Sequence, residues 1–123
     1  MLEFEQLTDR IIGAAINVHK ALGPGFVESI YENASVIEIR KCGLRVEHQY
    51  LIVVEYEGIE VGRHRLDTLV EGVIVVENKV VEELDRHHFA QVRSYLKALR
   101  LKHGLLFNYA KRTLEIKRVM LEV

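Results

Sequence analysis

The chain has 123 residues, of which 49% are hydrophobic and 28% charged, and its formal net charge is −1. This is the composition of a globular protein long enough to bury its own core, so we predict a single domain over residues 1–123. No apolar stretch approaches the roughly 18 residues of a membrane span, and the acidic N-terminus lacks the zones of a signal peptide, so we expect no membrane partner. One cysteine, Cys42, excludes an internal disulfide framework and a cysteine-based zinc site, which favours a cytoplasmic location.

Two helices are predicted in the first third of the chain. Thr8 or Asp9 can cap the first helix, and the sequence LGPG at 22–25 ends it. The second helix is expected over roughly 26–42, with Gly43 as its C-terminal stop. Its expected inward residues are Phe26, Ile30, Ala34, Val36 and Ile37.

The middle and the end of the chain alternate between strand and helix patterns. Glu57-Gly58 is a hairpin signal between two β-rich runs, and Asp85 can cap a third helix over about 86–102 that Gly104 would end. The expected strands are 47–56, 59–70, 73–81, 105–109 and about 113–120. The predicted order is ααβββαββ, in which the strand–helix–strand unit implies a right-handed crossover with parallel pairing. We therefore predict an α/β fold with a mixed β-sheet flanked by helices.

The charge is divided unevenly along the chain. Residues 1–62 hold 5 basic and 10 acidic residues, a net of −5, and residues 63–123 hold 12 and 8, a net of +4. Basic clusters at Arg63–Arg65, Lys97–Lys102 and Lys111–Arg118 could form a face that binds a polyanion. A solvated surface of mixed charge is the plainer interpretation, and the sequence leaves both open.

The strand VIVVENKVV, residues 73–81, carries ionisable side chains within an apolar run. Ionised groups in a buried strand cost free energy unless they are paired or bind a metal. Because side chains alternate between the faces of a strand, Glu77 and Lys79 share one face, roughly 7 Å apart, and Asn78 points to the other.

Asp67 precedes Glu77 by ten positions, on the preceding strand. A three-residue turn, Glu71-Gly72-Val73, would set the two acidic residues directly opposite each other on one face. A two-residue turn would not, and the sequence alone leaves this open.

If the two carboxylates converge beside the ammonium group of Lys79, the cluster has the groups for phosphodiester hydrolysis. Two carboxylates alone would repel each other, and a divalent cation such as Mg²⁺ removes the repulsion. The lysine can then stabilise a negative transition state or orient an attacking water. The plainer interpretation is an exposed ion pair at the edge of the sheet.

Three ordered motifs resemble those of a known family. Asp67 followed by Glu77-Asn78-Lys79 resembles the D…(D/E)xK signature of the PD-(D/E)XK nuclease superfamily, although Leu66 stands where that signature has proline. The sequence GFVESIY at 25–31 is similar to the motif that names the GxxExxY protein family, a branch of the superfamily. The segment 87–110, with a helical QxxxY before GLLFN, resembles the next part of that family.

The resemblance implies a restriction-endonuclease-like core and assigns roles to the acidic residues. Asp67 and Glu77 would be catalytic residues that bind Mg²⁺ or Mn²⁺, and Lys79 would be the catalytic lysine. Glu28 would reach the metal or its waters from the second helix.

Further candidates lie on the helices. The resemblance implies that Gln91 and Tyr95 line the site, and His88 falls on the same helix stripe, where it could contact a phosphate. Most such histidines are surface residues. Tyr31 shares a helix face with Glu28, and a core aromatic is an equally good interpretation for it.

Three functions are compatible with these residues. The first is a metal-dependent nuclease acting on DNA or RNA, and the second is a non-catalytic nucleic-acid-binding or protein-interaction module on the same fold. The third is a structural dimer whose acidic residues only form ion pairs. A homodimer also suits a small nuclease that must cut two strands, and LLFNY at 105–109 or the closing VMLEV could supply apolar surface for it. The sequence does not decide the oligomeric state.

Overall fold

The computed structural model describes residues 4–122, in which three helices and five strands follow one another in the predicted order ααβββαββ. The elements are α1 (Glu5–Leu22), α2 (Glu28–Lys41), β1 (Val46–Tyr56), β2 (Ile59–Val70), β3 (Ile74–Lys79), α3 (Arg86–Leu99), β4 (His103–Asn108) and β5 (Glu115–Met120). The strands form one sheet in the order β1-β2-β3-β4-β5, with β3 and β4 parallel and the other pairs antiparallel. None of the described helices has the length and apolar character needed to cross a lipid bilayer.

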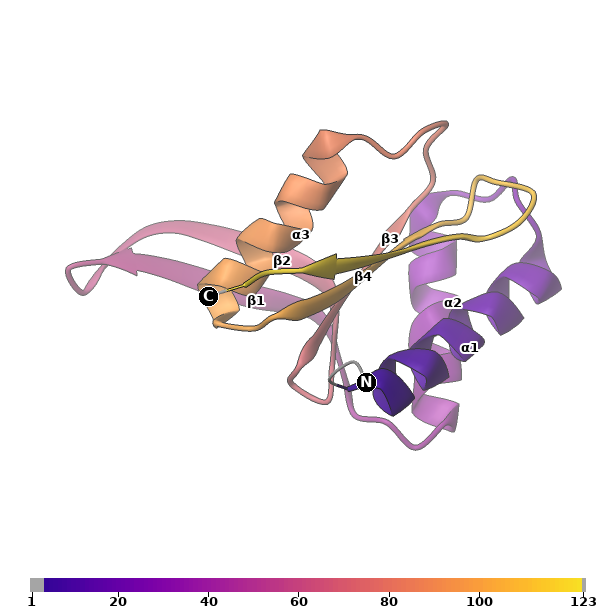
Figure 1. The fold of residues 1–123 in the computed structure, drawn as a ribbon, viewed down its shortest axis with the longest axis horizontal. Helices are drawn as coiled ribbons and strands as arrows, with labels where there is room; N and C mark the ends of the chain where they lie inside the picture. Colours follow the sequence, from indigo (N-terminus) through magenta and orange to yellow (C-terminus); the bar gives the residue numbers. More distant parts are fainter. Residues whose placement is uncertain (1–3, 123) are drawn as a thin grey trace.

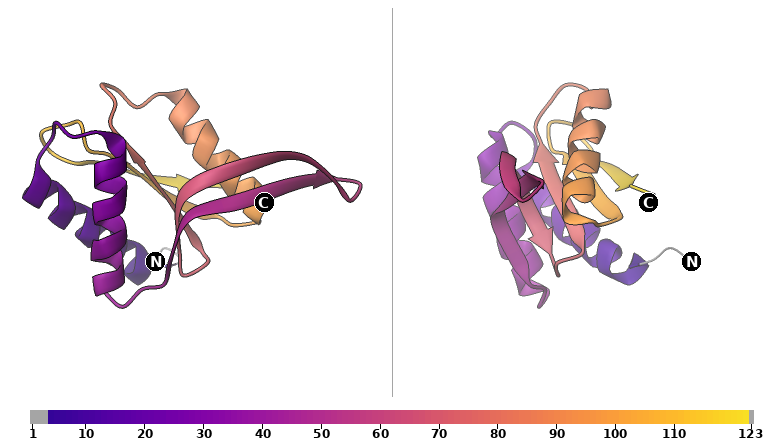
Figure 2. Two further views of the ribbon diagram at one scale, coloured as in Figure 1. Left: turned by 180° about the vertical axis from the view of Figure 1, so that it is seen from behind. Right: turned by 90° about the vertical axis from the view of Figure 1, so that its left-hand side faces the viewer.

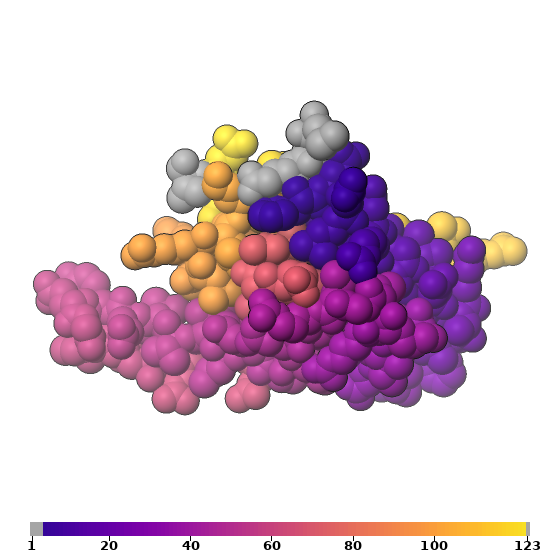
Figure 3. Space-filling model, turned by 90° about the horizontal axis from the view of Figure 1, so that it is seen from below, coloured from indigo at the N-terminus to yellow at the C-terminus, as the bar shows by residue number. Residues whose placement is uncertain are grey.

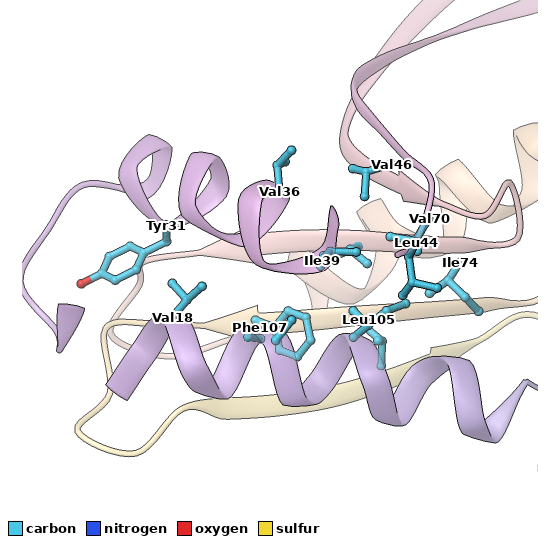
Figure 4. Close-up of a cluster of buried hydrophobic side chains, with 14 of the residues drawn as sticks. Val18, Tyr31, Val36, Ile39, Leu44, Val46, Val70, Ile74, Leu105 and Phe107 are labelled. Carbon is cyan, nitrogen blue, oxygen red and sulfur yellow. The ribbon is translucent and has the colours of Figure 1, made fainter. Parts of the chain in front are cut away.

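The helices cover both faces of the sheet (Figures 1 and 2). Helices α1 and α2 pack on one face over a cluster that includes Ile74 and Val76 of β3 (Figure 4). Helix α3 packs on the opposite face over a second cluster that includes Val75. β3 is therefore buried on both sides, which explains its continuous apolar run.

Helix α3 begins where the sequence predicts and ends earlier. The Asp85 side chain accepts the His87 N–H at 2.9 Å, and the Asp85 N–H is donated to Nδ1 of His88 at 2.9 Å, so both ends of a capping box are present. The helix ends at Leu99 with Arg100 in the left-handed region, φ 59°. The prediction that Gly104 ends the helix is wrong, since Gly104 lies in β4.

Two predictions about the first helices are also wrong. Helix α1 begins at Glu5, and Thr8 lies inside it, where its hydroxyl contacts the Glu5 carbonyl at 3.1 Å and Arg118 Nη1 at 2.6 Å instead of capping the helix. Helix α2 begins at Glu28, after Phe26, and the predicted inward residues Phe26, Ile30 and Ile37 are all exposed. The residues of α2 that are buried are Tyr31, Glu32, Ser35, Val36 and Ile39. Hydrophobicity does not mark this buried side, because it also carries the polar residues Glu32 and Ser35.

The hairpin of β1 and β2 extends beyond the rest of the sheet as an arm (Figures 1 and 3). β2 pairs with β3 only through Thr68↔Val76, Leu69↔Val75 and Val70↔Ile74. The last of these pairs leaves Glu71-Gly72-Val73 as a three-residue connection, which is the alternative that sets Asp67 opposite Glu77.

Strand β4, which lies between β3 and β5, is buried on both faces. Its residues Leu105, Leu106 and Phe107 are at most 1% exposed, and the following Tyr109 is fully buried. The expectation that residues 105–109 supply surface for a second copy is therefore wrong, because this segment lies inside the sheet.

We predict that Gly104→Ala destabilises the fold by about 1–3 kcal/mol, because a Cβ there would lie 2.7 Å from Val92 Cγ1. Urea unfolding gives the change in free energy. Gly13→Ala is the matched control, since a Cβ at this position of α1 has no atom within 4 Å and alanine favours the helix. Adding Val92→Ala to Gly104→Ala should cost less than the sum of the two single changes. Strict additivity would contradict a steric cause.

Candidate active site

Asp67 and Glu77 lie at the fork, which we define as the point beyond the Thr68↔Val76 pair where β2 and β3 separate. From the fork outward β2 continues beside β1, whereas β3 stays beside β4, with Glu77 paired to Leu106. The backbone N–H groups at this point lose their partners in the ladder, and buried N–H groups need other acceptors.

Two crossed hydrogen bonds supply those acceptors. The Asp67 N–H donates to Glu77 Oε2 at 2.8 Å, and the Asn78 N–H donates to Asp67 Oδ2 at 3.0 Å. Each carboxylate therefore reaches across to the backbone of the other strand. This arrangement explains why a strand as apolar as β3 holds a glutamate that is 2% exposed.

The two carboxylates raise the free energy of each other's charged forms. Burial is the main cause that raises the pKa of Glu77 to about 9, and the negative charge of Asp67 is the next. The charge of Lys79 acts in the opposite direction. Without a further cation, Glu77 therefore holds a proton at neutral pH.

Lys79 ends β3 beside a cavity of about 310 Å³ that His87, His88 and Gln91 also line. The end of the strand is fixed by Asn108, whose Nδ2 donates to the Val81 carbonyl at 2.8 Å. Its Oδ1 also accepts the Val81 N–H at 3.1 Å. The Lys79 side chain therefore extends from a backbone that hydrogen bonds hold in place, and it lies at the rim of an open cavity.

Helix α2 contributes Glu28, the candidate from the GxxExxY-like motif. Burial is the main cause that raises its pKa, the charges of Asp67 and Glu32 add to this, and the charge of Lys79 opposes it. A hydrogen bond from the backbone of Val80 also acts on its carboxylate. Glu28 thus stands close enough to both Asp67 and Lys79 to share their electrostatic environment.

Glu32 is a site residue that the sequence analysis missed. It is 7% exposed, accepts a hydrogen bond from Gln49 Nε2 and lies 3.1 Å from His48 Nε2. Burial raises its pKa, and the charge of Asp67 raises it further. Its position four residues after Glu28, on the same helix face, was a signal that could have identified it.

Helix α3 contributes Tyr95 from the opposite layer. Tyr95 is 5% exposed, and its ring meets the His64 ring edge-on at a centroid distance of 5.2 Å. Burial, followed by the charges of Glu77 and Asp67, raises the pKa of Tyr95 to about 12. Gln91 is exposed at the cavity, and His88 lines the same cavity while its Nδ1 completes the helix cap.

Tyr31 has a different environment from the other candidates. It is fully buried and stacks on Tyr109 with ring centroids 4.5 Å apart (Figure 4 shows its position). Its hydroxyl donates to the Gly23 carbonyl at 2.5 Å and accepts the Phe26 N–H at 3.2 Å. These contacts fix the loop before α2. They therefore also fix the start of the helix, from which Glu28 reaches the site.

Within residues 4–122, no three histidine, cysteine or acidic side chains are grouped as a ready-made metal site. The donors at the fork nevertheless fit a hard divalent cation, because Mg²⁺ in proteins is usually held by only one or two carboxylates, waters and the substrate's phosphate. The electrostatics fit as well, since Asp67 raises the pKa of Glu77, and a cation between the two carboxylates would remove this repulsion.

Two comparisons with known proteins bear on the fold. The family model described as the PD-(D/E)XK nuclease superfamily matches residues 5–119. The fold is similar to the crystal structure of SSO0001, with a TM-score of 0.62 and 16% sequence identity over 98% of this chain and 60% of that one. The chain therefore spans less than two thirds of that protein, and at this identity the likeness concerns the fold alone. No curated protein matches the sequence. The predicted restriction-endonuclease-like α/β fold is confirmed.

The raised pKa of Glu77 predicts a pH-dependent stability. Between about pH 4.5, the ordinary value, and about pH 9 the native state keeps a proton that the unfolded chain has lost. This stabilisation is complete below pH 4.5 and is lost as the pH rises through about 9, at up to about 1.4 kcal/mol per pH unit. Urea unfolding of Glu77→Gln in a chelator should show a flatter decline over this range than the natural protein. Glu57→Gln, in the exposed hairpin turn, is the control, and parallel curves for the natural protein and Glu77→Gln would refute the prediction.

Proposed function

Because the chain belongs to the PD-(D/E)XK nuclease superfamily, we propose that it is a metal-dependent nuclease that hydrolyses phosphodiester bonds of nucleic acid. The observation that carries this proposal is the pair of crossed hydrogen bonds that brings Asp67 and Glu77 together at the fork, with Lys79 two positions along β3. The motif GFVESIY supports a further assignment to the GxxExxY branch.

Asp67 and Glu77 would hold Mg²⁺ or Mn²⁺, and Glu28 would reach the cation or its waters from α2. When bound there, a divalent cation lowers the pKa of a coordinated water and polarises the phosphoryl oxygen. Each of the two carboxylates accepts a hydrogen bond from a backbone N–H of the other strand, so their positions are set before the substrate binds.

Lys79 supplies the positive charge for the transition state. Its ammonium group, at the rim of the 310 Å³ cavity, would stabilise the negative charge that develops on the phosphate oxygens. Tyr95 stays protonated at neutral pH because its pKa is raised to about 12, so its hydroxyl remains a hydrogen-bond donor. Gln91 and His88, which line the cavity with Lys79, would contact the substrate beside the cleaved bond.

Three broader expectations accompany this function. We propose a cytoplasmic location, which the single exposed Cys42 supports, and one nuclease-like domain over residues 1–123, which the match to residues 5–119 supports. A homodimer stays a prediction, and sedimentation over a range of concentrations would test it.

We predict that Asp67→Asn, Glu77→Gln and Lys79→Met each lower metal-dependent cleavage of DNA or RNA by roughly 10²–10³-fold. The first two changes would weaken binding of the cation, and the third removes the positive charge that would stabilise the phosphate oxygens in the transition state. The measurement is the cleavage rate on single-stranded and duplex substrates with Mg²⁺ or Mn²⁺. Lys20→Met, the same change at an exposed position in the last turn of α1, should leave the rate nearly unchanged.

Equal, very low rates for the natural protein and Lys79→Met on all substrates would overturn the enzymatic proposal. If the natural protein then binds nucleic acid in a salt-dependent way that a chelator does not alter, the non-catalytic binding module is the better description.

We further predict that divalent metal binding releases about one proton at pH 7.5, since Glu77 must lose its proton to become a ligand. Titration calorimetry with Mn²⁺ in two buffers of different ionisation enthalpy measures this number. In Glu77→Gln the release should disappear and the affinity should fall. Heats that do not depend on the buffer would show that Glu77 does not lose a proton on metal binding, and an unchanged affinity in Glu77→Gln would show that it is not a ligand.

A further inference from the structure

We propose that Glu32 and Gln49 form a positioning pair that holds the backbone of β1 and β2 in the conformation that presents Asp67 to the reaction. Its expected effect on catalysis rests on the proposed nuclease function, whereas its effect on the fork does not. Neither residue needs to touch the substrate.

Gln49 has a backbone conformation that is unusual for a strand. Its φ is 56°, in the left-handed region, where a side chain other than glycine is disfavoured. The pairs His48↔Thr68 and Tyr50↔Leu66 flank it without a shift of register, so Gln49 lies opposite Asp67. The irregularity in β1 therefore stands directly beside the aspartate at the fork.

In both strands the alternation of side chains between the two faces of the sheet is interrupted near this position. Val46 of β1 and Val70 of β2 pack in the α1/α2 cluster. Ile52 of β1 and Leu66 of β2, an even number of residues away in each strand, pack in the α3 cluster. In a regular strand, residues separated by an even number of positions point to the same face. Here they point to opposite faces, so each strand must be twisted or irregular between them. At this position the charge of Asp67 raises the pKa of Glu28 and Glu32 on α2 and of Tyr95 on α3.

Glu32 supplies the contacts that hold Gln49 in place. Its Oε1 accepts the hydrogen bond from Gln49 Nε2 and lies 3.1 Å from His48 Nε2, so one carboxylate oxygen binds two successive residues of β1. The carboxylate is 7% exposed and comes from the middle of α2. A rigid helix thus fixes the strained residue from outside the sheet.

The position of Asp67 depends on this backbone for two reasons. Its N–H and its carboxylate are both used at the fork, and a rotation of the backbone at residue 67 would break both crossed hydrogen bonds. A displaced carboxylate would lose its alignment with Glu77 and Lys79, and small displacements of catalytic groups are costly.

The direct test follows the amide protons that the fork protects. Hydrogen exchange measured by NMR on the metal-free protein reports the Asp67 and Asn78 amides separately. We expect Glu32→Gln and Gln49→Ala to speed exchange of both amides at least about tenfold, because the fork opens more often. Gln49→Gly should have a smaller effect than Gln49→Ala, since glycine adopts the left-handed conformation without the strain.

The double variant tests how Glu32 acts. If Glu32 works by holding Gln49, then Glu32→Gln should change exchange and cleavage much less in the Gln49→Gly background than in the natural one. If Glu32 acts directly on a metal, Glu32→Gln should cost the same in both backgrounds, and that result would overturn the proposal.

Cleavage kinetics give the functional readout. Glu32→Gln should lower kcat about 10- to 100-fold while KM for nucleic acid stays within about twofold, since the substrate contacts are intact. Glu38→Gln is the matched control, because Glu38 lies on the same helix and pairs with Lys41 at 3.1 Å. Natural rates of amide exchange in both Glu32→Gln and Gln49→Ala would overturn the positioning role. Protected amides in a natural protein that cleaves nothing would instead overturn the nuclease assignment.

Discussion

The crossed hydrogen bonds between Asp67 and Glu77 are the constraint on which the rest of the site depends. They occur where two strands must separate, so the backbone there needs acceptors that the ladder no longer supplies. Using carboxylates as these acceptors brings two acidic groups from different strands together. The same bonds that satisfy the backbone thus build the group of side chains that we propose as the cation site.

Asp67 is also the electrostatic centre of the site. Its negative charge contributes to the raised pKa of four groups: Glu28 and Glu32 on α2, Glu77 on β3 and Tyr95 on α3. Such a concentration of acidic groups is destabilising in the absence of a cation, and the fold offsets it through protonation of Glu77, the backbone hydrogen bonds at the fork and the nearby Lys79. Natural proteins retain such local costs mainly at functional sites.

Helix α2 shows how the cluster of acidic side chains changes the packing of the fold. Its buried side holds Glu32 and Ser35, whereas Ile30 and Ile37 face outward. The same helix is fixed at its start by Tyr31, which binds the preceding loop and stacks on Tyr109. The helix therefore acts as a support for acidic side chains as much as an element of the core.

The sequence by itself determined the order of the elements, the hairpin at 57–58 and the Asp85 cap, because these follow from local turn chemistry and the period of side chains. It could not determine the inward face of α2, whose buried side is partly polar, or the role of Gly104, which depends on the approach of Val92 from α3. The convergence of Asp67 and Glu77 required the three-residue turn, and Gln49 carries no sequence signal for a left-handed backbone. Only tertiary structure decided these features, since each one results from contacts between segments distant in the chain.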